Sequence, residues 1–216
     1  MRKKIILVLL IVLFGCKNEK KEIINTFNDF NTANIELNGE KIYELTDSET
    51  HKYYSRFLSK TLKLDSIEIT ELNLTEKINL LSARAIIKDS ILKKISPKDL
   101  MIKIYIELST MDSTQINAIK ELGIANIQID NKKAICDFII NGDTLSPNVN
   151  LRFSKENGQW KYNPLSMADY TEKRLETICK YQGFSHMEFI EWIFSASNME
   201  NKKVKELNEI WNPIIK

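Results

Sequence analysis

The spacing of apolar residues changes along the chain, and each change marks a different part of the molecule. Residues 5–14 are ten consecutive apolar residues. From residue 23 to about 122, apolar side chains recur every three or four positions, which predicts a series of amphipathic helices. Residues 124–162 alternate apolar and polar side chains, as strands do, and helical spacing returns from 167. The pattern therefore predicts an α+β fold.

Local signals set the expected limits of the helices before the strands. Asn38-Gly39 is expected to end the first helix, because both residues tolerate a left-handed backbone. Residues 46–49 fit a capping box, and Ser96-Pro97 fits a helix start. The expected helices cover residues 23–37, 40–45, 50–62, 75–95, 97–108 and 114–122.

The strand region is expected to be an antiparallel meander of about four strands. Asn131-Lys132, Asn141-Gly142 and Asn157-Gly158 supply the short turns. Pro147, in the third strand, indicates an edge or a bulge. We expect the N-terminal helices to pack on a curved, mainly antiparallel sheet, with a C-terminal helical extension after residue 166.

The first sixteen residues have the layout of an export signal. Three basic residues precede the apolar run, and Gly15 and Cys16 follow it. Ten apolar residues are too few to span a bilayer as a helix, which takes about 20. Residues 13–16, Leu-Phe-Gly-Cys, resemble the lipobox of bacterial lipoproteins. The resemblance implies cleavage before Cys16 and acyl chains, palmitate among them, on that residue.

The lipobox resemblance implies a lipid-anchored protein of the bacterial cell envelope, on the periplasmic side or surface of the outer membrane. The membrane is then a partner, held through the lipid on Cys16, because two or more acyl chains anchor a protein stably. The expected organisation is a signal peptide, a lipidated tether, an α+β domain and a C-terminal helical extension, over residues 1–15, 16–22, 23–166 and 167–216.

The net charge of the chain changes sign if residues 1–15 are removed. The formal net charge is +2, and residues 1–15 hold three basic residues and no acidic ones. The mature chain therefore carries a net charge of −1. Nucleic-acid binding needs concentrated Lys and Arg to neutralise phosphates, so we expect no nucleic-acid partner.

Two further segments resemble the nuclear-transport-factor-two-like superfamily, also called polyketide-cyclase-like. Residues 38–50 look like that family's Asn-Gly turn, helix and cap, and residues 153–162, with Gly158-Gln159-Trp160, look like its closing hairpin. The resemblance implies a curved sheet wrapped by helices, with a cavity on the concave face. The helical stretch 75–122 and the roughly 50 residues after the last strand depart from the simplest members.

The leading functional hypothesis is a non-enzymatic module that binds a small apolar ligand or a protein partner near the membrane. Tyr54, Arg84, Asp137 and Trp160 are the candidate pocket residues. Arg84 lies in an apolar helix, where it either pairs with a buried acid such as Asp137 or reaches water with its charged end. No cofactor or metal is expected, because the chain has only two histidines and no zinc-binding spacing.

Two alternatives remain open. In the first, the protein is a cavity enzyme of the isomerase or hydrolase type, with His51 as general base beside a carboxylate such as Asp137 and a tyrosine. An exposed or helix-capping role for His51 competes with that interpretation. In the second, the C-terminal helices 168–212 dock an envelope protein through an apolar face containing Trp192 or Trp211.

Two chemical features are independent of these hypotheses. Cys136 and Cys179 could form a disulfide in an oxidising envelope or stay buried as thiols, and spacing alone does not decide. Four Asp-Ser/Thr sequences resemble the acceptor motif of a bacterial O-glycosylation system; they begin at residues 65, 89, 112 and 143.

Overall fold

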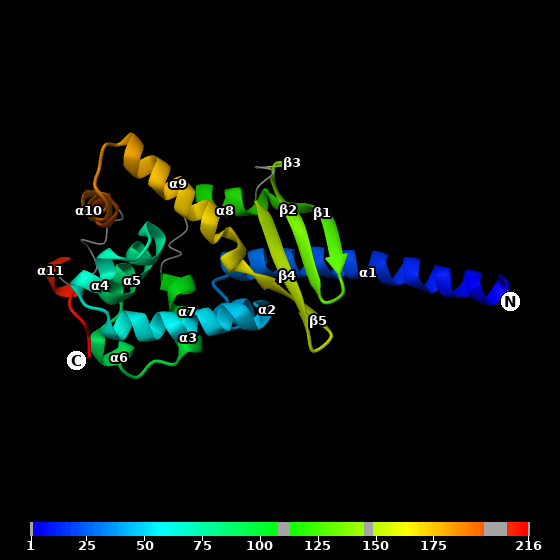
Figure 1. The fold of residues 1–216 in the computed structure, drawn as a ribbon, viewed down its shortest axis with the longest axis horizontal. Coiled ribbons are helices and arrows are strands. Elements are labelled where there is room, and N and C mark those ends of the chain that lie inside the picture. Colours follow the sequence, from blue (N-terminus) through cyan, green and yellow to red (C-terminus); the bar gives the residue numbers. More distant parts are fainter. Residues whose placement is uncertain (1, 108–112, 145–148, 197–206, 216) are drawn as a thin grey trace. The chain divides into compact units, whose positions relative to one another are not determined.

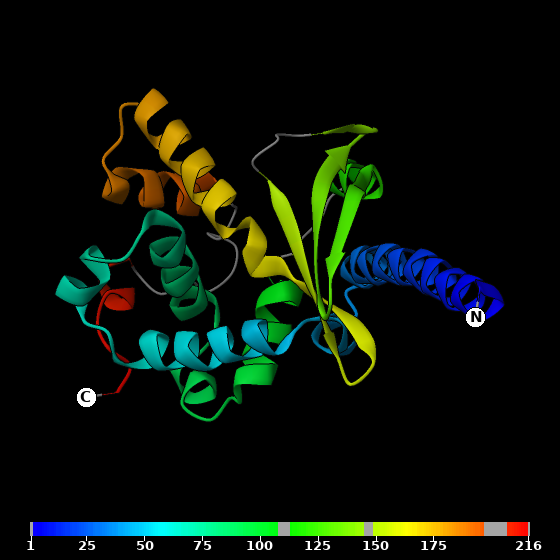
Figure 2. The same ribbon diagram turned by 45° about the vertical axis from the view of Figure 1, so that its right-hand side comes forward.

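The computed structural model describes residues 2–107, 113–144, 149–196 and 207–215 (Figures 1 and 2). The chain forms an α+β structure, as its apolar pattern predicts, with helices before and after an antiparallel sheet. It divides into two compact units. Unit 1 contains residues 1–48 and 109–166, and unit 2 contains residues 49–108 and 167–216.

Unit 1 is built on the sheet. All strand pairs are antiparallel, in the order β1-β2-β4-β5, with the short β3 paired to β2. The elements of this unit are α1 (Arg2–Ile35), α2 (Gly39–Leu45), α8 (Ser113–Lys120), β1 (Leu122–Asp130), β2 (Lys133–Ile140), β3 (Asp143–Thr144), β4 (Asn150–Glu156), β5 (Gln159–Asn163) and the 3-10 turn η1 (Pro164–Met167).

Aromatic side chains of α1 fill one face of the sheet. The ring of Phe27 meets Phe138 and Tyr162 edge-on, with centroids 6.4 and 5.7 Å away, and Phe30 meets Tyr162 at 4.9 Å. Alternation along the strands places the remaining apolar side chains on this same face. They are Ala134, Cys136, Leu151, Phe153 and Trp160, all buried.

The start of unit 1 differs from the expected tether and helix end. Residues 16–22, expected as a tether, lie within the continuous helix α1. The left-handed residue after α1 is Leu37, with φ 53°. Asn38 begins α2 instead of ending the first helix, because its side chain accepts a hydrogen bond from Lys41 N at 3.1 Å. The role predicted for Asn38-Gly39 was therefore wrong, since an asparagine side chain can also cap a helix start.

The strand predictions are confirmed at the turns. Asn141-Gly142 and Asn157-Gly158 both have two successive residues with positive φ, as two-residue hairpins require. β1 carries a bulge between Ala125 and Gln128. Pro147, expected at an edge or bulge, lies outside the described residues.

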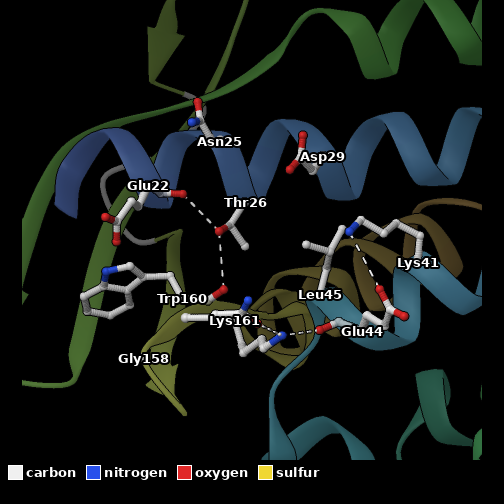
Figure 3. A pocket seen from close by; sticks show the side chains of 11 residues that line it. Glu22, Asn25, Thr26, Asp29, Lys41, Glu44, Leu45, Gly158, Trp160 and Lys161 are labelled. Atoms are coloured by element: carbon white, nitrogen blue, oxygen red, sulfur yellow. Dashed lines mark hydrogen bonds and ion pairs between the residues drawn. The ribbon is translucent and has the colours of Figure 1, made fainter. Parts of the chain in front are cut away.

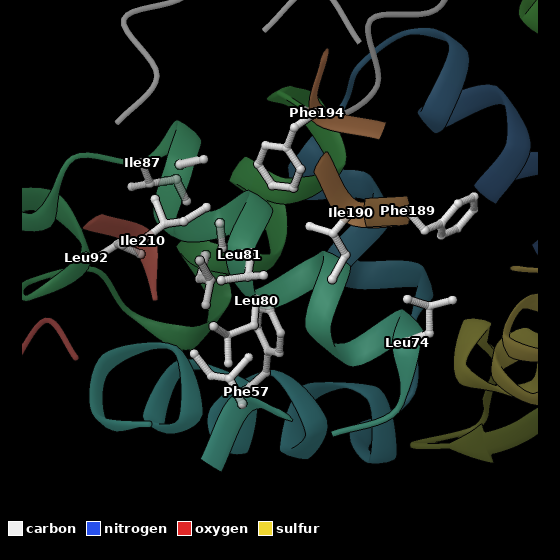
Figure 4. Close-up of a cluster of buried hydrophobic side chains, with 14 of the residues drawn as sticks. Phe57, Leu74, Leu80, Leu81, Ile87, Leu92, Phe189, Ile190, Phe194 and Ile210 are labelled. Carbon is white, nitrogen blue, oxygen red and sulfur yellow. The ribbon is translucent and has the colours of Figure 1, made fainter. Parts of the chain in front are cut away.

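Unit 2 is helical and combines a segment that precedes the strands in the sequence with a segment that follows them. Phe57, Leu80 and Leu81 share one apolar core with Phe189 and Ile190 (Figure 4). The linear segments 23–166 and 167–216 expected from the sequence thus differ from the discontinuous units of the structure. The helices are α3 (Ser48–Lys63), α4 (Ser66–Thr70), α5 (Leu74–Ile86), α6 (Asp89–Leu92), α7 (Pro97–Glu107), α9 (Ala168–Tyr181), α10 (His186–Ala196) and α11 (Leu207–Ile210).

The helix expected over 75–95 is interrupted. Ile87 has an extended backbone, with φ −97° and ψ 125°, and its side chain is 2% exposed. Burying this side chain in the core of unit 2 takes the chain out of the helix, so α5 and α6 are separate. Periodicity alone did not show this break, because Ile87 also fits the helical spacing.

The first turn of α5 is capped by a side chain from α9. The Glu172 carboxylate accepts hydrogen bonds from Leu74 N at 2.9 Å, from Thr75 N at 2.8 Å and from the Thr75 hydroxyl. Burial raises the pKa of Glu172, but these hydrogen bonds, together with the nearby His186, outweigh burial and hold the pKa below its usual range.

We expect Glu172→Gln to destabilise unit 2 by about 1 kcal/mol at pH 7, because hydrogen bonds to a charged acceptor are stronger than those to an amide. A carboxylate whose pKa is lowered by folding stabilises the fold above its unfolded pKa and loses that effect as the pH falls through the folded value. The difference from the unmodified protein should therefore shrink below about pH 4. Urea unfolding at pH 7 and at low pH measures it, with the exposed Glu191→Gln as control; a difference independent of pH would contradict this account.

Candidate functional site

A pocket of about 400 Å³ lies in unit 1 between α1, α2 and the β4–β5 hairpin (Figure 3). Its lining is mostly charged or polar. The lining residues are Glu22, Asn25, Thr26 and Asp29 from α1, Lys41, Glu44 and Leu45 from α2, and Gly158, Gln159, Trp160 and Lys161 from the hairpin.

The helical repeat of α1 creates the first wall. Glu22, Asn25, Thr26 and Asp29 are spaced by three, four and seven residues, so they share one side of the helix beside its buried apolar stripe. The Thr26 hydroxyl lies 3.0 Å from the carbonyl oxygen of Glu22 and 3.3 Å from that of Trp160. Thr26 thereby links α1 to β5 at the pocket.

The second wall comes from α2 and β5. A parallel bridge between Thr46 and Tyr162 holds the end of α2 against β5. Lys161 Nζ donates to the carbonyl oxygen of Glu44 at 2.6 Å and to Gln159 Oε1 at 3.2 Å. Lys41 and Glu44 form an exposed ion pair at 3.7 Å. This wall therefore holds two ammonium groups and one carboxylate.

Three charged groups of the two walls, on Glu22, Asp29 and Lys161, are not paired within the pocket, although Lys155, outside the lining, interacts electrostatically with Glu22. Both oxygens that bind Lys161 belong to uncharged groups. In the described part of the chain, Glu22 accepts a hydrogen bond from the Asn18 amide at 3.2 Å, and Asp29 is exposed. Among the described residues, neither carboxylate has an ion-pair partner within 4.0 Å. The pocket thus has an acidic wall on α1 and a cation, Lys161, on β5.

One end of the pocket is fixed close to Cys16 in α1. Lys155 Nζ binds Glu19 Oε1 at 2.6 Å and lies 5.6 Å from the centre of the Trp160 ring system. The hydrogen bond to Glu19 raises the pKa of Lys155. Trp160 is 3% exposed, and its Nε1 has no hydrogen-bond partner among the described residues. The contacts of Lys155 hold α1 against the hairpin three residues after Cys16.

Of the four candidate pocket residues, the structure places only Trp160 at this pocket. Asp137 lies on β2, where its carboxylate accepts from Asn126 Nδ2 at 2.7 Å. Tyr54 and Arg84 belong to unit 2.

Arg84 is a structural group in the core of unit 2. It is 0% exposed, so the expectation that its charged end reaches water was wrong. Its guanidinium donates to the carbonyl oxygens of Thr61 at 2.7 Å, Leu64 at 2.7 Å and Ile210 at 3.0 Å. Burial lowers the pKa of Arg84 to about 10, which leaves it charged at neutral pH. A fork of donors that matches three backbone acceptors explains why this arginine tolerates burial.

Tyr54 and His51 both lie on α3. Tyr54 packs against Tyr53 and Phe57, and burial raises the pKa of its hydroxyl well above the usual value. His51 is half-buried, and its carbonyl oxygen accepts from the Ser55 hydroxyl at 3.2 Å. His51 and Asp137 fall in different units, so their pairing as base and carboxylate stays a prediction.

The two cysteines after Cys16 are free, buried thiols. Burial, with the neighbouring Asp137, raises the pKa of Cys136 to about 12, so this group stays a thiol. Cys179 Sγ lies 3.2 Å from the carbonyl oxygen of Phe184. Both behave as small apolar core residues.

Two of the four glycosylation-like motifs, at 65–67 and 89–91, lie wholly in the described part of the chain, and the motif beginning at Asp143 is described through Thr144. The hydroxyl residues Ser66, Ser90 and Thr144 are exposed. Ile67 and Ile91, the apolar residues of two motifs, are 73% and 42% exposed. Of the motif beginning at Asp112, the aspartate lies outside the described residues, whereas Ser113 and Thr114 begin α8. Modification at these sites stays a prediction, which an intact-mass measurement showing added hexose would support.

The sequence did not single out Glu22, Asp29 or Lys161. Residues 16–22 were predicted to be a lipidated tether, and Lys161 falls in the segment 153–162 that resembles a closing hairpin. The available signal was the polar spacing along α1, which any solvated helix face also shows.

Other site types have no counterpart in the described residues. No three His, Cys, Asp or Glu side chains there are grouped so that they could hold a metal ion. Across the same residues, no helix combines the length and apolar content needed to cross a membrane. Comparisons with protein-family models, curated proteins and solved structures found no match.

Proposed function

We propose that this protein is a lipid-anchored binding module of the bacterial envelope that holds a small polar ligand in the pocket between α1, α2 and the β4–β5 hairpin. The observation that carries the binding role is the pocket itself, with unneutralised charges on facing walls. The anchor is supported by the layout of residues 1–16, which ends in Gly15-Cys16.

The anchor and the pocket share one helix. Cys16 and Glu22 both lie on α1, six residues apart, which is about 9 Å along a helix axis. A diacylglycerol on Cys16 would hold this end of α1 at the membrane surface. We therefore propose that the pocket works next to the lipid headgroups.

The pocket favours a polar ligand over the apolar ligand expected from the sequence. The nuclear-transport-factor-two-like resemblance implies a cavity between the sheet and the helices that wrap it, whereas aromatic side chains of α1 fill the face of the sheet that α1 covers. The pocket lies at the edge of the sheet beside β5, and its walls are charged. Membership of that superfamily remains a proposal that rests on residues 38–50 and 153–162.

Docking of an envelope protein is a second candidate function, favoured by exposed apolar residues of α9 and α10. Tyr181, Met187 and Trp192 are 87%, 41% and 45% exposed. Large exposed apolar side chains of this kind can contribute to an interaction surface. A photo-crosslinker placed at residue 192 in intact cells tests this role, and the absence of any crosslinked protein would contradict it.

The binding proposal is tested by filling the pocket. Asn25→Trp adds a large side chain to the pocket wall, whereas Asn28→Trp adds the same group at an exposed α1 position that does not line the pocket. A ligand at 100 times its Kd stabilises a protein by about 2.7 kcal/mol, which raises the melting temperature by several degrees. We expect a protein-free extract of the producing cells to stabilise the unmodified protein and Asn28→Trp, but not Asn25→Trp. Equal shifts in all three proteins, or none, would contradict the proposal.

A further inference from the structure

The unneutralised charges of the pocket are separated in space. Glu22 and Asp29 stand on α1, whereas Lys161 stands on β5 on the facing side (Figure 3). A simple cation would satisfy the α1 wall and leave Lys161 without an anion, and a simple anion would do the reverse. A ligand with both charges, a few bonds apart, complements both walls at once.

The donors and acceptors define the two charged groups more closely. The carboxylates of Glu22 and Asp29 only accept hydrogen bonds, so they favour an ammonium with N–H donors. Lys161 uses two of its donors on uncharged oxygens and keeps a third for an anion. Lysine is a common phosphate ligand in proteins, and charge-assisted bonds of this kind are among the strongest hydrogen bonds.

The proposed position at the membrane indicates where a ligand with an ammonium and a phosphate would come from. Through Glu19 and Lys155, the hairpin is fixed to α1 three residues beyond Cys16. A volume of about 400 Å³ is in the usual range for small-molecule pockets. A pocket next to the headgroup layer meets compounds that join a primary ammonium to a phosphate, either as lipid headgroups or as free molecules.

We propose that the pocket binds a phosphoethanolamine group, with its ammonium on Glu22 and Asp29 and its phosphate on Lys161. This inference rests on the proposed function and names the ligand class of the same site. The group is shared by zwitterionic lipids and by free phosphoethanolamine, and the two sources are separated by the experiment.

The first arm measures binding of free phosphoethanolamine to the purified, lipid-bearing full chain in a non-ionic detergent, by calorimetry. Phosphocholine is the matched probe, because its quaternary ammonium has the same charge but no N–H donor. We expect phosphocholine to bind at least about tenfold more weakly, which is the loss of one good hydrogen bond. Equal binding of the two compounds, or no binding of phosphoethanolamine, would overturn the inference.

Two substitutions test whether each wall of the pocket contacts the ligand. We expect Asp29→Asn and Lys161→Gln each to weaken phosphoethanolamine binding at least about tenfold. The control substitutions Glu36→Gln and Lys132→Gln, at exposed residues that do not line the pocket, should change binding less than about twofold. Equal melting temperatures of all four variants exclude misfolding as the cause. Unchanged binding in both pocket variants would overturn the assignment.

The second arm places the lipid-bearing chain in nanodiscs containing phosphatidylethanolamine or phosphatidylcholine, each with the same anionic lipid, and measures hydrogen exchange of residues 157–161. If exchange is slower only in nanodiscs with phosphatidylethanolamine, the ligand is the lipid headgroup. If exchange is equal in both nanodiscs and phosphoethanolamine binds in the first arm, the ligand is the free compound. The cell extract gives a separate outcome. If phosphoethanolamine does not bind, but the extract stabilises the unmodified protein and not Asn25→Trp, the inference fails and the proposed binding function stands.

Discussion

Replacing Arg84 with alanine is expected to destabilise unit 2 by about 4 kcal/mol, enough to unfold much of the unit in a protein of ordinary stability. The substitution removes the shared donor from three carbonyl oxygens, two of them bonded to Arg84 in fully buried surroundings. Each buried acceptor left without a partner costs about 1–3 kcal/mol, and the vacated volume adds to this cost.

The Arg84 effect has a local signature. The bond to the Ile210 carbonyl links α5 to the C-terminal α11, so residues 207–215 should lose hydrogen-exchange protection first. Denaturant unfolding followed by tryptophan fluorescence, to which Trp192 and Trp211 of unit 2 contribute, gives the free energy. Arg84→Lys should recover only part of the stability, because an ammonium lacks the planar fork that meets three carbonyls. The exposed Arg56→Ala is the control, with an expected change below about 0.5 kcal/mol; an equally small change for Arg84→Ala would contradict the structural role.

Replacing Cys16 with serine is expected to abolish lipid attachment almost completely. A serine hydroxyl cannot form the thioether that holds the diacylglycerol, and each CH₂ buried in the membrane contributes about 0.8 kcal/mol. Metabolic labelling with palmitate should mark the unmodified protein in the membrane fraction and leave the Cys16→Ser protein unlabelled.

Two measurements make the Cys16 prediction specific. Cys136→Ser and Cys179→Ser change buried thiols elsewhere in the chain and should keep the label. The mass of the unmodified protein should show loss of residues 1–15 and addition of lipid, whereas Cys16→Ser should retain the precursor mass. An unmodified protein without palmitate and with residues 1–15 intact would contradict the lipoprotein proposal, whatever the pocket binds.

Features set by a few adjacent residues were predictable. The turns at Asn141-Gly142 and Asn157-Gly158 follow from the preference of these residues for positive φ, and the start of α7 after Ser96 follows from its cap, with Ser96 Oγ 3.1 Å from Asp99 N. Alternating and helical spacing then gave the α+β class, because the period of the pattern reports which face is buried.

Features that depend on distant partners were not predictable. The same helical spacing is satisfied whether α5 packs on α9 or on the sheet, so periodicity could not show that helices on both sides of the sheet in sequence share one core. Arg84 shows the same limit, because its three acceptors are backbone oxygens, which every residue carries.

The sequence by itself therefore determined the order of helices and strands and the tight turns, since each depends on residues close together in the chain. The proposed export and lipidation signal rests on the sequence alone. Only the tertiary structure decided the pocket. Glu22 and Asp29 are ordinary polar residues of a helix until the folding of unit 1 brings Lys161 to face them, some 130 residues later in sequence. The packing of α1 on β5 brings these three charged side chains together, and no local sequence pattern predicts that packing.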